Sequence, residues 1–163
     1  MKEYEEFYVY WSGPHELQYD EEAEAYSIKS TPIDLDGSLI VYAIYGQHPV
    51  FGRDSLLYIG QTKNLNLRSV DHFKKRGRFW YQISPSIHIG SVCDENENPI
   101  TNQSILSDVE EILIASHVPP MNARTINCPN IKCKDKLVYN FWNRGQLLPI
   151  CSGYWFDYTD TGK

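Results

Sequence analysis

The sequence has no long apolar run and no excess of positive charge. No stretch of the 163 residues reaches the ~18 consecutive apolar residues that a membrane-spanning helix needs. The first residues, MKEYEEFYVYWSG, lack the pattern of a signal peptide, so we expect an intracellular, cytoplasmic protein with no membrane partner. The 15 Lys and Arg against 21 Asp and Glu give a formal charge of −6. This charge excludes a protein held on nucleic acid by bulk positive charge, such as a histone-like binder.

Cysteine is also scarce, because four cysteines in 163 residues are too few for a disulfide scaffold. Four residues separate Cys128 from Cys133. A zinc site built from the four cysteines, with or without His117, is one interpretation, although zinc sites usually show a tighter pair that is repeated. Free thiols are the other interpretation. The sequence leaves the role of these residues open: Cys93, Cys128, Cys133 and Cys151.

The composition favours one compact domain over residues 1–163. Apolar residues make up 42% of the chain and charged residues 22%, so a full hydrophobic core can form. The order strand, strand, helix, strand, helix, with an added N-terminal strand, predicts an α/β (α+β) fold. We expect strands at 4–11, 38–45, 55–61 and, interrupted near Pro85, 79–92, and helices at about 64–75 and 107–117.

The segments between these elements are predicted to be mainly loops. Loops are expected at 12–36, around a short strand near 26–28, and at 46–54, where proline and glycine gather. A capping-box pattern at Ser107 predicts the start of the second helix, with Thr101 or Ser104 as earlier alternatives. Pro119 and Pro120 end that helix. The tail holds an apolar stretch at 137–142 and a last candidate strand at 153–158.

Charge is distributed unevenly along the chain. Residues 1–36 carry ten acidic and two basic side chains, a local charge of −8, and residues 63–78 carry six basic side chains against Asp71, a local +5. The basic stretch is either a solvated helix face or a phosphate-facing surface. The acidic stretch either turns away from such a surface, masks it or mimics a phosphate backbone. The candidate nucleic-acid-binding residues are Lys63, Lys74, Lys75, Arg76 and Arg78.

Three segments together resemble the GIY-YIG nuclease family. They are VYAIY at 41–45, YIGQTKNLNLRSVDHF at 58–73 and EEILIASHVPPMN at 110–122. No phosphate-binding glycine loop, His-Glu-x-x-His motif or serine elbow accompanies them. The resemblance covers residues 38–125 and implies a small mixed, mainly antiparallel central sheet flanked by helices. Residues 1–37 and 126–163 would be additions to this core.

The resemblance also implies roles in phosphodiester hydrolysis, which requires charge neutralisation and a water aimed in line with the leaving oxygen. Tyr42 would be the general base, assisted by a neutral His72. Tyr58 would hold the phosphate or the water, and Arg68 would bind the scissile phosphate. Glu110 would bind one Mg²⁺ or Mn²⁺ ion. A further residue, Asn122, would fix Glu110 or the backbone beneath it.

The chain departs from the family pattern in its first motif. Ile40 stands where the family has its first glycine, and the connection between Tyr42 and Tyr58 is about five residues longer than usual. The local pattern favours Tyr42 as the motif tyrosine and leaves Tyr45 as an alternative. Because strand side chains alternate between faces, only one of these two can serve. Each candidate taken alone is an ordinary core, turn or surface residue, and only the joint spacing supports catalysis.

The resemblance implies a stand-alone, restriction-like DNA endonuclease in a bacterial or phage setting. It would need a divalent metal and no organic cofactor. One site cuts one strand, so a homodimer is expected as well. The alternative is a non-catalytic DNA-binding or protein-interaction module on the same fold. A third class is a structural or inhibitory protein whose acidic residues 1–36 mimic DNA.

Overall fold

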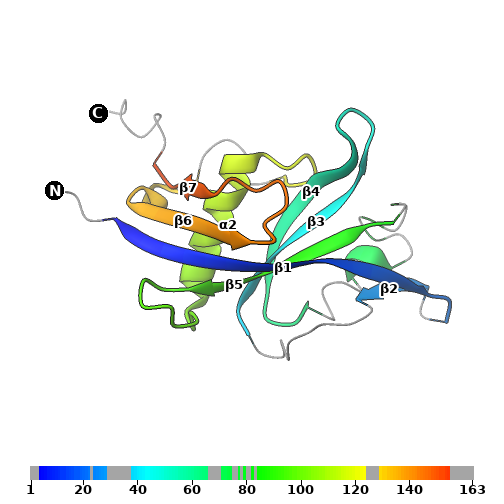
Figure 1. The fold of residues 1–163 in the computed structure, drawn as a ribbon, viewed down its shortest axis with the longest axis horizontal. Helices are drawn as coiled ribbons and strands as arrows, with labels where there is room; N and C mark the ends of the chain where they lie inside the picture. Colours follow the sequence, from blue (N-terminus) through cyan, green and yellow to red (C-terminus); the bar gives the residue numbers. More distant parts are fainter. Residues whose placement is uncertain are drawn as a thin grey trace.

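The protein is a mixed α+β fold dominated by one curled sheet, as the order of elements predicts (Figure 1). The computed structural model describes residues 4–22, 24–28, 38–65, 71–74, 77, 79, 82, 84–123 and 129–154. Within these residues the sheet has seven strands in the order β4-β3-β5-β1-β6-β7, and β2 pairs with β1 off this path. No helix among them is both long and apolar enough to cross a membrane.

All neighbouring strands run antiparallel except β1 and β6, which are parallel. The elements are β1 (Glu5–Asp20), β2 (Ala25–Ile28), β3 (Ile40–His48), β4 (Gly52–Thr62), β5 (Ser86–Cys93), α2 (Gln103–His117), the 3₁₀ helix η1 (Ile131–Cys133), β6 (Lys136–Trp142) and β7 (Ile150–Ser152). Residues 71–73 are also helical. The predicted first helix is therefore seen in part, because residues 66–70 lie outside the described residues.

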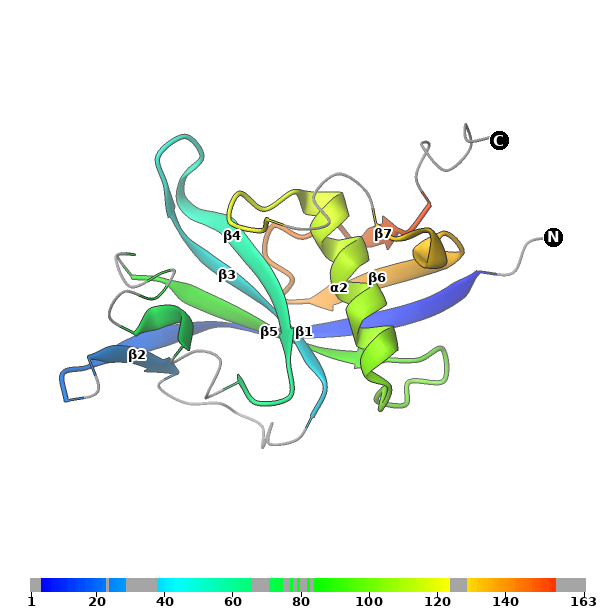
Figure 2. The same cartoon turned by 180° about the vertical axis from the view of Figure 1, so that it is seen from behind.

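The sheet separates two hydrophobic cores. Alternate residues of β3 point to opposite faces, so Val41 and Ala43 pack with α2, while Tyr42 and Ile44 pack on the other side. Figure 2 shows α2 lying across its face of the sheet. The second core is completed by aromatic residues after β4, with Phe73 fully buried.

The first strand is much longer than predicted, and the expected loop over 12–36 is wrong for residues 12–20. Gly13 has φ +125, which favours glycine, and the register shifts between Ser12 and His15. The strand continues past this bulge because β5 and β2 supply hydrogen-bonding partners on its two sides. Tertiary pairing thus overrides the local turn signal of Gly13 and Pro14. The short strand expected near 26–28 is confirmed as β2.

The expected loop over 46–54 is also wrong, because its residues lengthen the hairpin strands and leave a turn at 49–51. The turn is closed by His48, whose Nδ1 accepts from the backbone N–H of Val50 and Phe51, each at 3.2 Å. The rings of His48 and Phe51 stack with centroids 4.6 Å apart. Farther along, the register steps from Tyr58 to Leu56, which leaves one extra residue in β4.

Helix α2 begins four residues before the capping box predicted at Ser107. Asn102 is the N-cap, and its Oδ1 accepts from the backbone N–H of Ser104 at 2.8 Å. Ser107 instead donates to the carbonyl of Gln103 at 3.0 Å. The helix ends at Val118, in a left-handed conformation before the two prolines.

The other boundaries agree in part with the sequence. The apolar stretch at 137–142 is confirmed as a strand, β6. Strand β5 begins at Ser86, directly after Pro85. The predicted strand over 79–92 is therefore too long at the described residues 79, 82, 84 and 85, and residues 80, 81 and 83 lie outside the described residues. Strand β7 was not predicted, and most of the candidate strand at 153–158 lies outside the described residues.

Candidate functional site

Tyr42, Tyr58 and His72 meet on the face of the sheet opposite α2. The hydroxyl of Tyr42 and Nε2 of His72 lie 2.8 Å apart in a buried hydrogen bond, and these residues are 1% and 7% exposed. Tyr58 is partly exposed, and its ring packs edge-on against His72 with centroids 5.2 Å apart. The backbone carbonyl of His72 accepts from the N–H of Phe79 at 2.9 Å, which ties the helical residues to the following turn.

Gly60 allows this cluster to pack closely. It is the register partner of Tyr42, and a Cβ at Gly60 would lie 2.4 Å from the Tyr42 hydroxyl and 2.7 Å from Cε1 of Tyr58. Such contacts are shorter than real Cβ contacts, and the buried Tyr42 ring has little room to move. Glycine is therefore required here because both tyrosine rings lie against the β4 backbone.

Tyr45 lies on the opposite face of β3 from Tyr42, as the strand period predicts. Its hydroxyl donates to the carbonyl of Arg144 at 3.3 Å and accepts from the N–H of Gln146 at 3.2 Å. Burial raises the pKa of Tyr45 to about 12. Tyr45 therefore anchors the C-terminal loop (residues 143–149), whereas Tyr42 contacts His72.

Glu110 reaches the sheet from α2, on the face opposite the tyrosines. Its Oε2 accepts from Nε2 of Gln61 at 2.7 Å, and the same amide group contacts Ser107 Oγ at 3.0 Å. Gln61 directly follows Gly60 and pairs with Val41. Glu110 and the Tyr42 hydroxyl thus approach the same short segment of β4 from its two faces, and the main-chain strand lies between them.

Asn122 binds the backbone of the same segment from the edge of the sheet. Its Oδ1 accepts from the N–H of Ile59 at 3.0 Å, and its Nδ2 donates to the carbonyl of Ile59 at 2.8 Å. The N–H of Met121 donates to the carbonyl of Leu57 at 3.0 Å. Since β4 is the last strand in the sheet order, this turn takes the place of a further strand. Asn122 therefore holds the backbone between Tyr58 and Gly60.

The predicted phosphate-binding residues are only partly described. Lys63 is exposed directly after the end of β4, and Lys74 pairs with Asp71 at 2.7 Å on the surface. Lys63 and Lys74 are thus the two basic candidates that the structure describes. The others lie outside the described residues: Arg68, Lys75, Arg76 and Arg78.

The donor chemistry at Glu110 fits one hard divalent cation. Mg²⁺ binds through one or two carboxylates and completes its coordination with waters and substrate phosphates. No group of three or more His, Cys, Asp or Glu in the described part of the chain forms a full protein cage for a metal. The neighbouring Glu111 is turned elsewhere, because its Oε2 accepts from the N–H of Asn130 at 3.1 Å. Glu110 is therefore the carboxylate that faces β4.

The described cysteines are buried free thiols rather than ready metal ligands. Burial raises the pKa of Cys133 to about 12 and that of Cys151 to about 11, so both remain protonated at neutral pH. Cys93 is buried as well, and burial raises its pKa. Cys128 lies outside the described residues.

Sequence reasoning missed Gln61, which links Glu110 to β4 and also contacts Gln103. Its position directly after the YIG motif was the available signal, but only the packing of α2 shows its partners.

No family model, no curated protein and no solved structure matches the chain. Its function is therefore inferred from its own residues and their geometry.

Proposed function

We propose that this protein is a divalent-metal-dependent endonuclease that hydrolyses phosphodiester bonds in DNA, of the GIY-YIG type that its motifs resemble. The observation that carries the proposal is the hydrogen bond of 2.8 Å between the buried Tyr42 hydroxyl and His72 Nε2. An imidazole in contact with a phenol provides a place for the proton that a tyrosine base must release.

The strand arrangement supports the same proposal. Strands β4, β3 and β5 are antiparallel neighbours, with the motif-bearing hairpin at one end of the sheet. Helical residues 71–73 lie between β4 and β5 in the chain, and α2 follows β5. The resemblance implies a small, mainly antiparallel core flanked by helices in this order.

In the proposed reaction, Tyr42 passes its phenolic proton to His72 Nε2 and takes a proton from the attacking water. The water oxygen bonds to phosphorus, and the bond from phosphorus to the 3′ oxygen breaks. The departing oxygen takes a proton from solvent water, and His72 returns its proton to solvent. Tyr58, the partly exposed member of the cluster, meets the bound phosphate, and Arg68 offsets its charge. Glu110, which approaches β4 from the opposite face, would hold the Mg²⁺ or Mn²⁺ ion, and that ion would stabilise the departing oxygen of a phosphate bound at the edge of the sheet formed by β4. The products are a 3′-hydroxyl and a 5′-phosphate.

The test is a plasmid-nicking assay in Mg²⁺, Mn²⁺ or EDTA, with chemical analysis of the ends. Two matched pairs of variants use neighbouring residues with different orientations. Glu110→Gln is compared with Glu111→Gln, and Tyr42→Phe with Tyr45→Phe. The first member of each pair should lower the rate by about 10²-fold or more. The second member should retain activity, because Glu111 contacts Asn130 rather than β4 and Tyr45 contacts the C-terminal loop rather than His72.

Nicking that survives Glu110→Gln, or ends other than 3′-hydroxyl and 5′-phosphate, would contradict the proposed mechanism. A folded protein that binds DNA and cuts it in neither metal would instead identify a non-catalytic binding module. Two measurements test the expected homodimer. The plasmid assay gives the rate of single-strand nicking relative to double-strand cleavage, and sedimentation gives the oligomeric state.

A further inference from the structure

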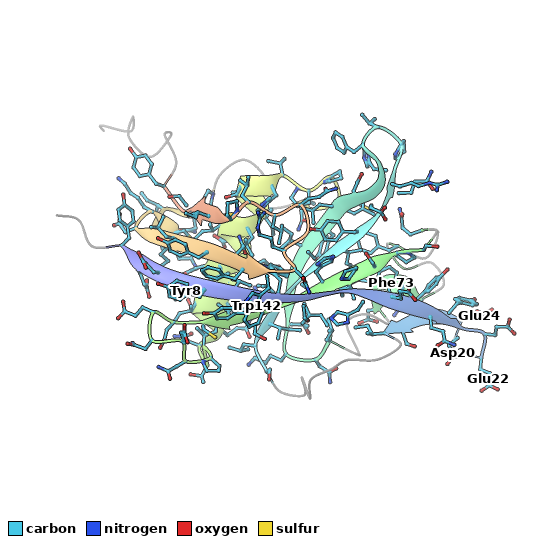
Figure 3. All side chains as sticks on the ribbon, in the orientation of Figure 1. Tyr8, Asp20, Glu22, Glu24, Phe73 and Trp142 are labelled. Atoms are coloured by element: carbon cyan, nitrogen blue, oxygen red, sulfur yellow. The ribbon has the colours of Figure 1, made fainter. Side chains whose placement is uncertain are left out.

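Five aromatic side chains form a continuous row on the β1–β6 pair, here called the aromatic face. They are Tyr8, Tyr10, Tyr139, Phe141 and Trp142. The Tyr8 ring stacks on Tyr139 with centroids 5.4 Å apart, and Tyr10 lies 5.6 Å from Phe141 and 4.7 Å from Trp142. Figure 3 shows Tyr8 and Trp142 along these two strands. The rings meet because the parallel register places Tyr8 opposite Tyr139 and Tyr10 opposite Phe141.

The aromatic face lies on the side of the sheet away from α2. The alternate residues of β1, such as Phe7 and Val9, point into the core beneath α2. Among the described residues no helix or strand covers this side of the β1–β6 pair, which faces the viewer in Figure 1 with α2 behind it. Trp142 is 75% exposed and Phe141 39% exposed. Tyr8, Tyr10 and Tyr139 are partly exposed. Contiguous aromatic residues that reach solvent in this way typically mark an interaction site.

The charges that contact this face are acidic. Glu6 accepts from the hydroxyls of Tyr8 and Tyr139 at 2.9 and 3.3 Å, and Glu97 accepts from Tyr10 at 3.3 Å. Hydrogen bonding to Glu6 raises the pKa of Tyr8, and burial raises the pKa of Tyr10, so both phenols stay neutral at neutral pH.

The lysine of β6 does not offset these carboxylates on the aromatic face. Lys136 lies over the ring of Phe7, on the core side, and pairs with Asp108 at 2.8 Å and Glu5 at 3.0 Å. The row therefore combines aromatic rings with negative charge, which disfavours the phosphates of a nucleic acid.

We propose that the aromatic face docks a basic, arginine-bearing segment of a partner protein. Guanidinium groups stack on aromatic rings and bind carboxylates through paired N–H donors, so Arg matches both features of the surface. Glu6, held between two tyrosine hydroxyls, and Trp142, the most exposed ring, are the principal contacts. This inference is independent of the proposed nuclease activity.

The test is a fluorescence-anisotropy titration of the full chain with a labelled Arg-Gly repeat peptide. Trp142→Ser and Glu6→Gln should each weaken binding at least about fivefold. The matched controls are Ile131→Ser, at an exposed apolar residue on η1, and Glu22→Gln, at an exposed acid in a turn. Both controls should bind as the wild type does, and replacing each Arg of the peptide by Lys should weaken binding.

Several results would overturn the proposal. Absence of saturable binding would show that the aromatic face does not dock the peptide. Equal weakening of binding by Glu22→Gln and Glu6→Gln would show that the peptide is held by general charge attraction. A single-stranded oligonucleotide that binds the wild type and is weakened by Trp142→Ser would identify a base-stacking surface instead. A wild-type dimer that Trp142→Ser dissociates in sedimentation would identify a contact between two copies of the chain.

Discussion

Replacing Asn122 by alanine removes both hydrogen bonds to Ile59 and should destabilise the protein by about 1–3 kcal/mol. The magnitude follows from a net value of about 0.5–1.5 kcal/mol for each hydrogen bond. Ile59 is fully buried, and the partly exposed Asn122 leaves a space that water can enter, which keeps the loss within this range.

The assay is urea unfolding followed by far-UV circular dichroism. With a slope of about 2 kcal/mol/M, a loss of about 2 kcal/mol lowers the midpoint by about 1 M urea. Asn96→Ala is the control, because only the backbone N–H of this exposed loop residue donates a hydrogen bond, to Asp94. Its midpoint should stay within the equivalent of about 0.5 kcal/mol.

The nicking assay on the same variants separates two roles for Asn122. If Asn122 only positions the β4 backbone, lost activity should accompany lost stability, and low temperature should restore part of both. An unchanged midpoint together with abolished nicking would refute this reasoning, because Asn122 would then act on the substrate or the metal. An unchanged midpoint and unchanged nicking would show that the two hydrogen bonds make no net contribution to the free energy of unfolding.

Three other changes test the packing. Gly60→Ala should cost about 1–3 kcal/mol in urea unfolding, because its Cβ would overlap the buried Tyr42 ring, and a wild-type midpoint would contradict this overlap. Burial lowers the pKa of His117 below its ordinary value, so the free energy of unfolding should be steady above about pH 6.5 and fall below it; His117→Gln should reduce this dependence between pH 7.5 and 5.5. Asp108→Ala should cost about 2–4 kcal/mol in thermal or urea unfolding, because the half-buried Lys136 loses its buried partner, and a loss below about 0.5 kcal/mol would contradict that role.

The pH prediction depends on the geometry of His117. Its Nδ1 contacts the carbonyl of Leu113 at 2.7 Å, and its Nε2 accepts from the N–H of Leu148 at 2.8 Å. Protonation of Nε2 removes this acceptor, so the C-terminal loop loses a hydrogen bond. A midpoint that rises as the pH falls from 7.5 to 5.5 would contradict the sign.

Local patterns predicted the types of most elements but misplaced several ends. The alternation around Val41 and Tyr42 correctly separated the two faces of β3, because side-chain direction follows from the strand period alone. The predicted end of β1 was wrong, because ladder hydrogen bonds to the distant strand β5 outweighed the local signal of Gly13. The predicted ends of the hairpin were wrong, because β3 and β4 pair with each other as far as His48 and Gly52 despite Pro49.

The sequence alone determined the spacing of Tyr42, Tyr58, Gly60 and His72. It also determined which side chains of one strand or helix share a face, because this follows from the strand and helix periods. Only the tertiary structure decided that His72 reaches Tyr42, that α2 brings Glu110 to Gln61 on the other face of β4, and that Asn122 closes the edge of the sheet. These contacts join residues that are 30, 49 and 63 positions apart in the sequence. They depend on how the helices pack on the two faces of the sheet, which no local period specifies.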